Sequence, residues 1–496
     1  MTSIPANAAP PQPASTLKGL SLYGLVQVAN GLAPLLTVPI FARAIGPDDY
    51  GVWDMLGAAM AIGIMLGNWG LPAAYTRFYF AYVNDAQRQQ RLLGTLVGFT
   101  SLCLIAVCGL FYALGEPLTR LAGVPAFWSP LLMLVIVFGS LRCLEEFFLL
   151  YFRNSGQAAA YAQWDLLRLV LQTALSLVLV LAFGLGVYAL ALSCMAAYAA
   201  VLAVLIWRMG LRTCLAIDTA ILRECLAFGW PLMTKIVMSV LSLVISRGML
   251  TYITGGTASQ GILGRANGLA NMVFMFMVAA ENIYSPRWNH VLFQTGQTGK
   301  SLGRLFTEHA AISSYMALGL ILLGQEFVSL ILPPAYAGAQ SLVIVLALYY
   351  ALLAFQQVQG AALHYLKMTK SQMACVFGSY VALVALNLVL IPRWEAMGAA
   401  LGTLASGVLT IAAFELLLVK RYRIGYEGRK LLFLYGSLVV CSGVAMACTA
   451  GWVDYWAGLA TRLALLAGLS LGWAGVLGWA TVANVAGRLW CRMART

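Results

Sequence analysis

Apolar runs of about twenty residues recur from near the start of the chain to its end. A helix needs about 20 mostly apolar residues to cross the hydrocarbon core of a bilayer. Hydrophobic residues make up 61% of the 496 residues and charged residues only 9%, against about 25% in soluble domains. The sequence therefore predicts an all-α polytopic membrane protein. It lacks the alternating ten-residue segments that are typical of membrane β-barrels.

The apolar runs predict about fourteen transmembrane helices. Their connections are short, so no soluble domain is inserted between them. Residues 1–17 are rich in Pro and Ala and lack the apolar centre of a secretory signal, so we expect a disordered cytoplasmic tail there. The predicted spans start near residues 18, 51, 92, 128, 164, 187, 228, 261, 306, 340, 372, 397, 431 and 458.

Lysine and arginine are concentrated in alternate connections, including those near residues 88–91, 208–223 and 420–430. Cytoplasmic loops of membrane proteins carry an excess of these residues. We therefore expect both termini in the cytoplasm, and membrane topology rather than nucleic-acid binding explains the net charge of +13. The opposite set of loops holds only Arg43, Arg120, Arg393 and Arg462.

The chain also repeats itself at an offset of roughly 205–214 residues. GVYALALSC (186–194) is similar to GAALGTLAS (398–406), and Arg43 corresponds to Arg247. One period contains six predicted spans, so both copies begin on the same side and form a parallel repeat. We expect two six-helix lobes, residues 18–210 and 211–424, followed by two helices and a cytoplasmic C-terminus in residues 425–496. This is a transporter architecture, with a substrate path between the lobes.

Polar side chains form a stripe along each of two matching spans. In the first span, Tyr23, Gln27, Asn30, Pro34 and Thr37 follow one another at steps of three or four residues, so they share one helix face. The seventh span carries a similar series of one lysine and three serines between residues 235 and 246. We interpret the two stripes as walls of one central cavity.

Lys235 is the strongest single candidate for substrate contact. It lies about 10 Å into its span, and no acidic residue stands three or four positions away. The alternative is that its ammonium group snorkels to the membrane interface. Arg77 and Arg265 lie nearer the ends of their spans, so snorkelling is a stronger alternative for them.

Charged residues in the fourth and eighth spans have two interpretations each. Arg142, Glu145 and Glu146 share a face and either neutralise one another or contribute to the cavity. Glu281 either couples transport to protons or pairs with an arginine. The cavity candidates are Lys235, Arg77, Arg142, Arg247, Arg265, Asn30, Gln27, Asn68, Asn271 and Gln357, and the coupling or ion-pair candidates are Glu281, Glu145 and Glu146.

Such a set of side chains suits a particular kind of substrate. Arginine binds phosphate through two parallel hydrogen bonds, and lysine binds it as a point charge. Amide and hydroxyl groups suit sugar hydroxyls, which both donate and accept hydrogen bonds. The ten cysteines contain no CxxC motif and no cluster with histidine, so we expect neither a disulfide framework nor a metal site, and no cofactor.

Several segments resemble the polysaccharide flippases, the Wzx-like branch of the MOP superfamily that also holds MATE exporters and lipid II flippases. TVPIFARAIGPDDYGVW (37–53) resembles the first-loop signature of this branch, and LNLVLIPRWEAMGAALGTLASGV (386–408) resembles the signature of its eleventh and twelfth helices. FGWPLMTKIVMSVLSLVISRGML (228–250) and FVSLILPPAYAGA (327–339) are also similar to the family. The resemblance extends over about residues 18–425.

The resemblance implies a transporter rather than an enzyme, with no catalytic residue. It would move undecaprenyl-pyrophosphate-linked oligosaccharide across the bacterial inner membrane by alternating access, for O-antigen, capsule or exopolysaccharide synthesis. It would act as a monomer beside a polymerase and glycosyltransferases. Two departures stand out. Ser246 precedes Arg247 where the family usually has an acid, which leaves Arg247 freer or the site altered. No arginine precedes Arg43, unlike the first helix of the lipid II flippases.

The segment PIFARAIGPDDYG (39–51) has a structural interpretation. Gly46 and Pro47 end one helix, with Gly46 able to adopt a left-handed cap. Asp48 and Asp49 then cap the next helix at its positive end. The alternative is a catalytic carboxylate pair of a membrane glycosyltransferase or polymerase. A MATE-type multidrug/cation antiporter is the other alternative, but the embedded charges lean basic.

Overall fold

A computed structural model gives the structure of the chain. It describes residues 36–82, 85–121, 128–210, 217–293, 299–366, 368–452 and 454–477, together with single positions between residues 22 and 33. The side chains of some helical residues, Lys235 among them, lie outside this description. The predicted tail at residues 1–17 and Gln27 also lie outside it.

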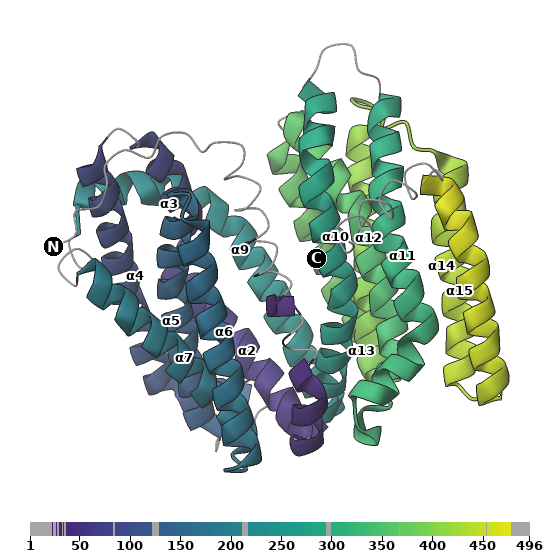
Figure 1. The fold of residues 1–496 in the computed structure, drawn as a ribbon, viewed down its shortest axis with the longest axis horizontal. Helices are drawn as coiled ribbons and strands as arrows, with labels where there is room; N and C mark the ends of the chain where they lie inside the picture. The colour runs from purple at the N-terminus through teal and green to yellow at the C-terminus, as the bar shows by residue number, and fades with distance from the viewer. Residues whose placement is uncertain are drawn as a thin grey trace, which may run out of the picture. The chain divides into compact units, whose positions relative to one another are not determined.

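The described residues form helices joined by short connections, and no strand occurs among them (Figure 1). Residues 36–44 are helical and precede the first labelled element. The labelled helices are α2 (Pro47–Asn68), α3 (Leu71–Ala81), α4 (Ala86–Leu121), α5 (Ser129–Asn154), α6 (Ala158–Leu181), α7 (Gly186–Met209), α9 (Thr219–Thr254), α10 (Ala258–Phe293), α11 (Gly299–Ile331), the short 3₁₀ helix η2 (Pro334–Tyr336), α12 (Ala339–Tyr365), α13 (Thr369–Leu418), α14 (Gly428–Thr449) and α15 (Tyr455–Leu477).

Each predicted span after the first falls on one of these helices. The second span is α2 and α3 together, which are separated by Trp69 and Gly70, both in a left-handed conformation. The eleventh and twelfth spans are the two parts of α13, which breaks at Glu395 (φ 46°), three residues after Pro392. Many helices begin before the predicted start of the span, because the helix includes polar residues that precede its apolar stretch.

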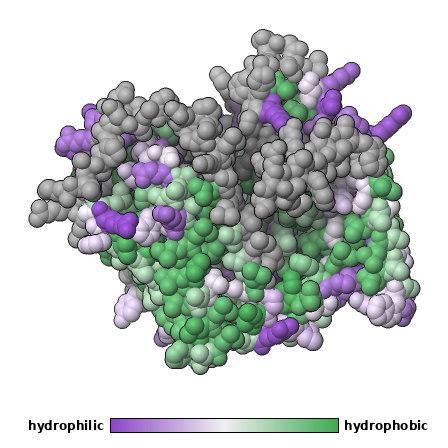
Figure 2. Space-filling model, in the orientation of Figure 1, coloured by the Kyte–Doolittle hydropathy of each residue, from purple (hydrophilic) through white to green (hydrophobic). Residues whose placement is uncertain are grey.

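Nine helices in the described part of the chain are long and apolar enough to cross a membrane. α5 is not among them because it carries Arg142, Glu145 and Glu146, and α13 is counted once despite its break. Apolar side chains cover most of the coloured surface in Figure 2, and hydrophilic ones gather toward the helix ends. The fold is therefore that of an all-α, multi-pass membrane protein.

One helix ends before residues 45–46 and the next begins directly after them, as the sequence indicates. Pro47 occupies the first turn of α2, followed by Asp48 and Asp49. The N-cap residue is Gly46, which has an extended backbone (φ −69°, ψ 168°) and no side chain to cap the helix. The expected left-handed glycine and side-chain cap are therefore wrong in detail, but both carboxylates lie at the positive end of the helix dipole.

The helices divide into two compact units, residues 1–261 and 262–496. In the first unit, buried aromatic side chains such as Tyr75, Phe147 and Phe148 pack with Leu71 and Leu92. α9 belongs to this unit because it packs against α2, α3 and α4. This division falls later than the predicted lobe boundary after residue 210 and does not test the repeat, so the lobe boundaries stay a prediction.

In the second unit, α11 packs against α12, α14 and α15, and α14 and α15 lie side by side (Figure 1). Arg462 of α15 is fully buried and makes a bidentate ion pair with Glu326 of α11, at 2.7 and 3.0 Å. It also donates to the carbonyl oxygens of Leu322 and Gly458, each at 3.2 Å. Arg462 is therefore a packing residue inside a helix and not the loop residue that the sequence predicts.

Candidate functional site

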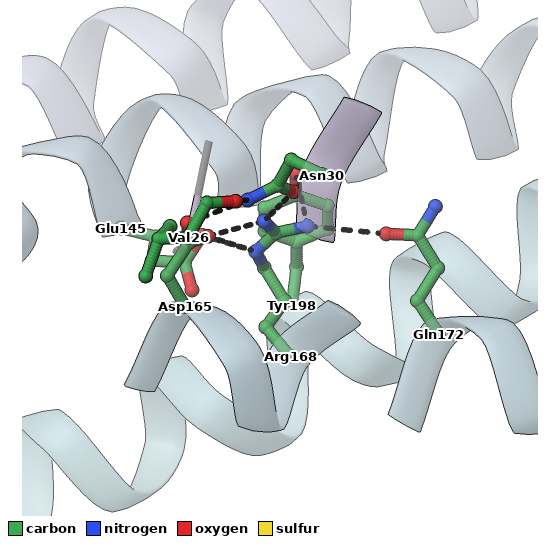
Figure 3. A network of polar contacts seen from close by, with 7 residues as sticks. All are labelled: Val26, Asn30, Glu145, Asp165, Arg168, Gln172 and Tyr198. Carbon is green, nitrogen blue, oxygen red and sulfur yellow. Dashed lines mark hydrogen bonds and ion pairs between the residues drawn. The ribbon is translucent and has the colours of Figure 1, made fainter. Parts of the chain in front are cut away.

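A buried ionic cluster centred on Arg168 lies inside the first unit (Figure 3). The guanidinium group donates from Nε to Asp165 Oδ1 at 3.1 Å and lies 3.6 Å from Glu145 Oε2. A second, very short contact joins its Nη2 to Asp165. Arg168, Asp165 and Glu145 are 8%, 6% and 2% exposed, so the ion pairs are shielded from solvent.

Neutral side chains complete the hydrogen bonds of this cluster. Arg168 donates to Asn30 Oδ1 at 3.1 Å, to Gln172 Oε1 at 3.2 Å and to Tyr198 Oη at 3.3 Å. Asn30 in turn donates to Asp165 Oδ2 at 2.9 Å and to the Val26 carbonyl at 3.0 Å. Figure 3 shows the amide of Asn30 facing both the carboxylate of Asp165 and the guanidinium group.

The cluster joins four helical segments. Asp165, Arg168 and Gln172 lie three and four residues apart on α6, so they share one face of that helix. Glu145 comes from α5, Tyr198 from α7, and Asn30 from the helical residues 29–31. Burial of an unpaired charge costs free energy. The two carboxylates that pair with Arg168 therefore favour this packing of α6 against α5.

Two carboxylates contact one guanidinium group in this cluster. If both are ionised, the contacting groups carry one excess negative charge, which is costly in a dry interior. A bound proton or a second cation would balance it. Arg142 of α5 is exposed and acts electrostatically on Glu145. Protonation of either carboxylate, or a cation bound nearby, would therefore change the charge balance of this cluster.

The sequence predicts only two members of this cluster, Asn30 and Glu145. It places the partner of Glu145 on the same helix, at Arg142, but the structure gives Glu145 an ion pair with Arg168 of α6. Glu146 is exposed, like Arg142. Asp165 and Arg168 are missing from the prediction. Like Arg142 and Glu145, however, they are opposite charges three residues apart within an apolar run, here residues 158–181, and could have been singled out for the same reason.

Arg247 is bound in the structure. Its guanidinium group donates to the backbone oxygen of Asp54 in α2, by a short hydrogen bond. Asp54 itself is buried. The presence of Ser246 in place of an acid therefore does not leave Arg247 free, because Arg247 donates a hydrogen bond to the backbone of another helix, α2.

A second polar chain lies inside the second unit. Gln357 of α12 donates to Glu281 of α10, and its Oε1 lies 2.8 Å from His309 Nε2 of α11. His309 is completely buried and packs against the rings of Tyr284 and Trp288. The predicted candidates Gln357 and Glu281 are thus in contact, and His309, which is not among the predicted residues, extends this chain of contacts to a third helix.

The remaining candidates are scattered. Arg77 is exposed on α3 and stacks over Phe228 at 4.4 Å, which agrees with a position near the span end. Asn68 is half-buried at the end of α2, and Arg265 and Asn271 are half-buried on α10. Lys235 belongs to α9, but its side chain lies outside the described residues, so its role stays a prediction.

Comparison with solved structures shows which fold this is. The chain is similar to a structure titled "Lipid II flippase MurJ, inward closed conformation", with a TM-score of 0.67, 12% identity, and coverage of 93% of this chain and 98% of that one. An inward-facing multidrug resistance MATE family transporter of the MOP superfamily gives a TM-score of 0.53 at 14% identity, over 79% of this chain and 96% of that one.

A MOP superfamily transporter from Pyrococcus furiosus gives a TM-score of 0.50 at 13% identity, over 82% of this chain and 94% of that one. At these identities the likeness shows the fold alone. No curated protein matches the sequence. The sequence profile described as "Polysaccharide biosynthesis protein" matches residues 16–293, which is more than half of the chain. The chain therefore belongs to the family of polysaccharide biosynthesis proteins.

Proposed function

We propose that this protein is a flippase that moves undecaprenyl-pyrophosphate-linked oligosaccharide repeat units across the inner membrane by alternating access. The product would feed the synthesis of a surface polysaccharide such as O-antigen, capsule or exopolysaccharide. The observation that carries the proposal is the polysaccharide biosynthesis profile over residues 16–293 on a chain with the fold of a lipid II flippase.

The polar groups inside the helices support transport of a polar substrate. Each unit contains a polar network that joins at least three helical segments, around Arg168 in the first and around Gln357 in the second. Ionisable groups in membrane spans are costly and are usually functional. Arg77 and Arg247 remain candidates for the pyrophosphate, and Asn68, Asn271 and Gln357 for sugar hydroxyls.

The cellular setting belongs to the proposal. The distribution of lysine and arginine supports a multi-pass protein with both termini in the cytoplasm. A polysaccharide polymerase and glycosyltransferases would act on the same lipid-linked intermediate, and the flippase itself would be a monomer that performs no covalent chemistry.

Reconstitution tests the proposal directly. Purified protein in liposomes receives a polyprenyl-diphosphate-linked oligosaccharide with a fluorescent sugar, and a membrane-impermeant reagent quenches the outer leaflet. We expect the fraction protected from quenching to change with time only in liposomes that contain the protein. A rate equal to that of protein-free liposomes, with correctly folded protein, would overturn the proposal.

A MATE-type multidrug/cation antiporter is the second candidate. The observation in its favour is the excess of carboxylates in the Arg168 cluster, on a fold shared with MATE transporters. Expression in a drug-sensitive host with its own exporters deleted separates the two. Efflux of cationic dyes would favour the antiporter, whereas protection of the lipid-linked probe without dye efflux favours the flippase.

A further inference from the structure

An apolar groove opens on the first unit where α2 ends. Trp69, Phe99 of α4, and Leu226 and Trp230 of α9 line it, all with aromatic or aliphatic side chains, and its volume is about 330 Å³. This volume falls within the range of small-molecule sites, about 300–1,000 Å³. The four lining residues come from three parts of the chain that pack together within this unit.

The backbone at the groove is held in an uncommon conformation. Trp69 has a φ of 49°, which is unfavourable for a bulky residue, and Gly70 follows with a φ of 73°. A Cβ atom on Gly70 would lie 2.5 Å from the Gly229 carbonyl oxygen, so the backbone just before α3 touches the backbone of α9 here. Strained residues of this kind persist where the surrounding structure fixes them, often at binding sites.

Two tryptophans form the wall of the groove. The indole rings of Trp69 and Trp230 stack with centroids 5.7 Å apart, and Trp230 is 62% exposed. Tryptophan in membrane proteins is concentrated at the two interfaces, yet Trp69 lies inside the span Pro47–Ala81. The stacked pair covers one face of each indole and leaves flat apolar ring surface on the groove for a slender chain with planar groups.

A cation lies on the groove-bearing face of α9. Arg223, Leu226 and Trp230 follow one another at steps of three and four residues, so they share one helix face. Arg223 is exposed and stands about 10 Å from Trp230 along the helix. The neighbouring acid, Glu224, lies on another face and accepts a hydrogen bond from Tyr82 at 2.7 Å.

We propose that this groove binds the first isoprene units of a polyprenyl diphosphate, with the diphosphate at Arg223. The proposal rests on the proposed function and adds the place where the lipid part of the substrate is held. In the predicted topology α9 begins at the cytoplasmic face, so the groove would take the lipid as it is loaded from the cytoplasmic leaflet.

Photoaffinity labelling tests the assignment on the full-length protein in nanodiscs. The probe is a polyprenyl diphosphate with a diazirine in its first isoprene units, and labelled peptides are mapped by mass spectrometry. We expect labels on the peptides around residues 69, 99 and 226–230. Unlabelled undecaprenyl diphosphate should compete, whereas phosphatidylglycerol at equal concentration should not.

Variants separate the chain subsite from the charge subsite. Trp230→Ala should weaken labelling about ten-fold with both the diphosphate probe and an uncharged polyprenol probe. Arg223→Gln should weaken labelling by the diphosphate probe alone. The matched controls, Trp207→Ala on the exposed face of α7 and Arg120→Gln at the exposed end of α4, should label normally.

Labels confined to other helices, equal competition by phosphatidylglycerol, or normal labelling of Trp230→Ala would each overturn the inference. Because Trp230 is exposed, we do not expect its replacement to disturb folding. Trp69 is left unchanged because it has an uncommon backbone conformation that a substitution could disturb. Wild-type flipping in liposomes distinguishes the two proposals. If flipping occurs but the groove is not labelled, only the inference fails, and if no flipping occurs, the proposed function fails.

Discussion

At the scale of single residues, the contacts of Arg168 show which interactions a sequence reveals. The pair Asp165–Arg168 lies three residues apart on one helix and is visible in the sequence. The pair Glu145–Arg168 joins α5 to α6, and no spacing rule predicts it, because it depends on how the two helices pack. For the same reason the sequence suggests a partner for Glu145 on its own helix, and misses the contact of Arg247 with α2.

Removal of Arg168 should destabilise the protein strongly. Arg168→Ala leaves Asp165 and Glu145 buried without their cation, which we expect to cost about 3–5 kcal/mol. Thermal unfolding in detergent measures the loss. The triple variant Arg168→Ala, Asp165→Asn, Glu145→Gln should recover most of the stability, and Arg120→Ala, at the exposed end of α4, serves as the control. Unchanged stability of the single variant would contradict the assignment of a buried ion pair.

Lys235 carries the sequence-based hypothesis for binding the pyrophosphate or an acidic sugar. Lys235→Ala should abolish flipping while leaving the amount of folded protein unchanged, because the lost interaction is with the substrate. Lys235→Arg should retain part of the activity, since it keeps the charge. The liposome assay measures both, and full activity of the alanine variant would exclude this role.

At the scale of secondary-structure elements, the sequence predicts the helices, because their positions follow from the length of the apolar runs. It does not predict the backbone conformation of the residues between them. Each predicted span after the first corresponds to a helix. The extended conformation of Gly46 and the left-handed pair at residues 69–70 depend on tertiary contacts and were not predicted. Arg462 shows the same limit, since its bidentate partner Glu326 lies on a helix far away in the sequence.

The carboxylates at the start of α2 are expected to stabilise the helix and not to act in catalysis. Asp48→Asn with Asp49→Asn removes two negative charges from the positive end of the helix dipole, which should cost about 0.3–1 kcal/mol each. Thermal unfolding should show this small loss, and flipping by the folded variant should remain. Complete loss of flipping in a well-folded variant would instead give these carboxylates a direct role in transport.

The connection between α13 and α14 provides a pH-dependent contact outside the spans. Burial alone would raise the pKa of Glu427, but hydrogen bonds from Lys430 and Thr307, with the charges of Lys430 and Arg304, lower the pKa overall. A lowered pKa in the folded state means that the contact stabilises the protein above pH about 4.5 and is lost as the pH falls further.

Glu427→Gln should therefore unfold at a lower temperature than the wild type at pH 7, and the difference should shrink as the pH falls below about 4.5. Unfolding curves of the two proteins at several pH values measure this. The exposed Asp85→Asn is a matched control, because Asp85 pairs with Arg88 at the surface. A difference that grows on acidification would contradict the direction of the pKa shift.

At the scale of the whole molecule, composition and hydropathy suffice to predict an all-α membrane protein, and the fold of MOP superfamily transporters agrees. The polar networks could be anticipated only in part. Asn30, Glu145, Glu281 and Gln357 stand out in the sequence because polar groups in a span are expensive, but Arg168 and His309 complete their networks from other helices. Which helices meet is a property of packing and not of any single span.

The central claim is that the chain moves a lipid-linked oligosaccharide from the cytoplasmic to the periplasmic leaflet. The most direct measurement is the leaflet location of that intermediate in cells with and without the protein, using an impermeant glycan-modifying reagent. Without the protein, the intermediate should accumulate intact on the cytoplasmic face, protected from the reagent. If it instead reaches the periplasmic face normally and stays unpolymerised, the protein acts in polymerisation and the flippase account is wrong.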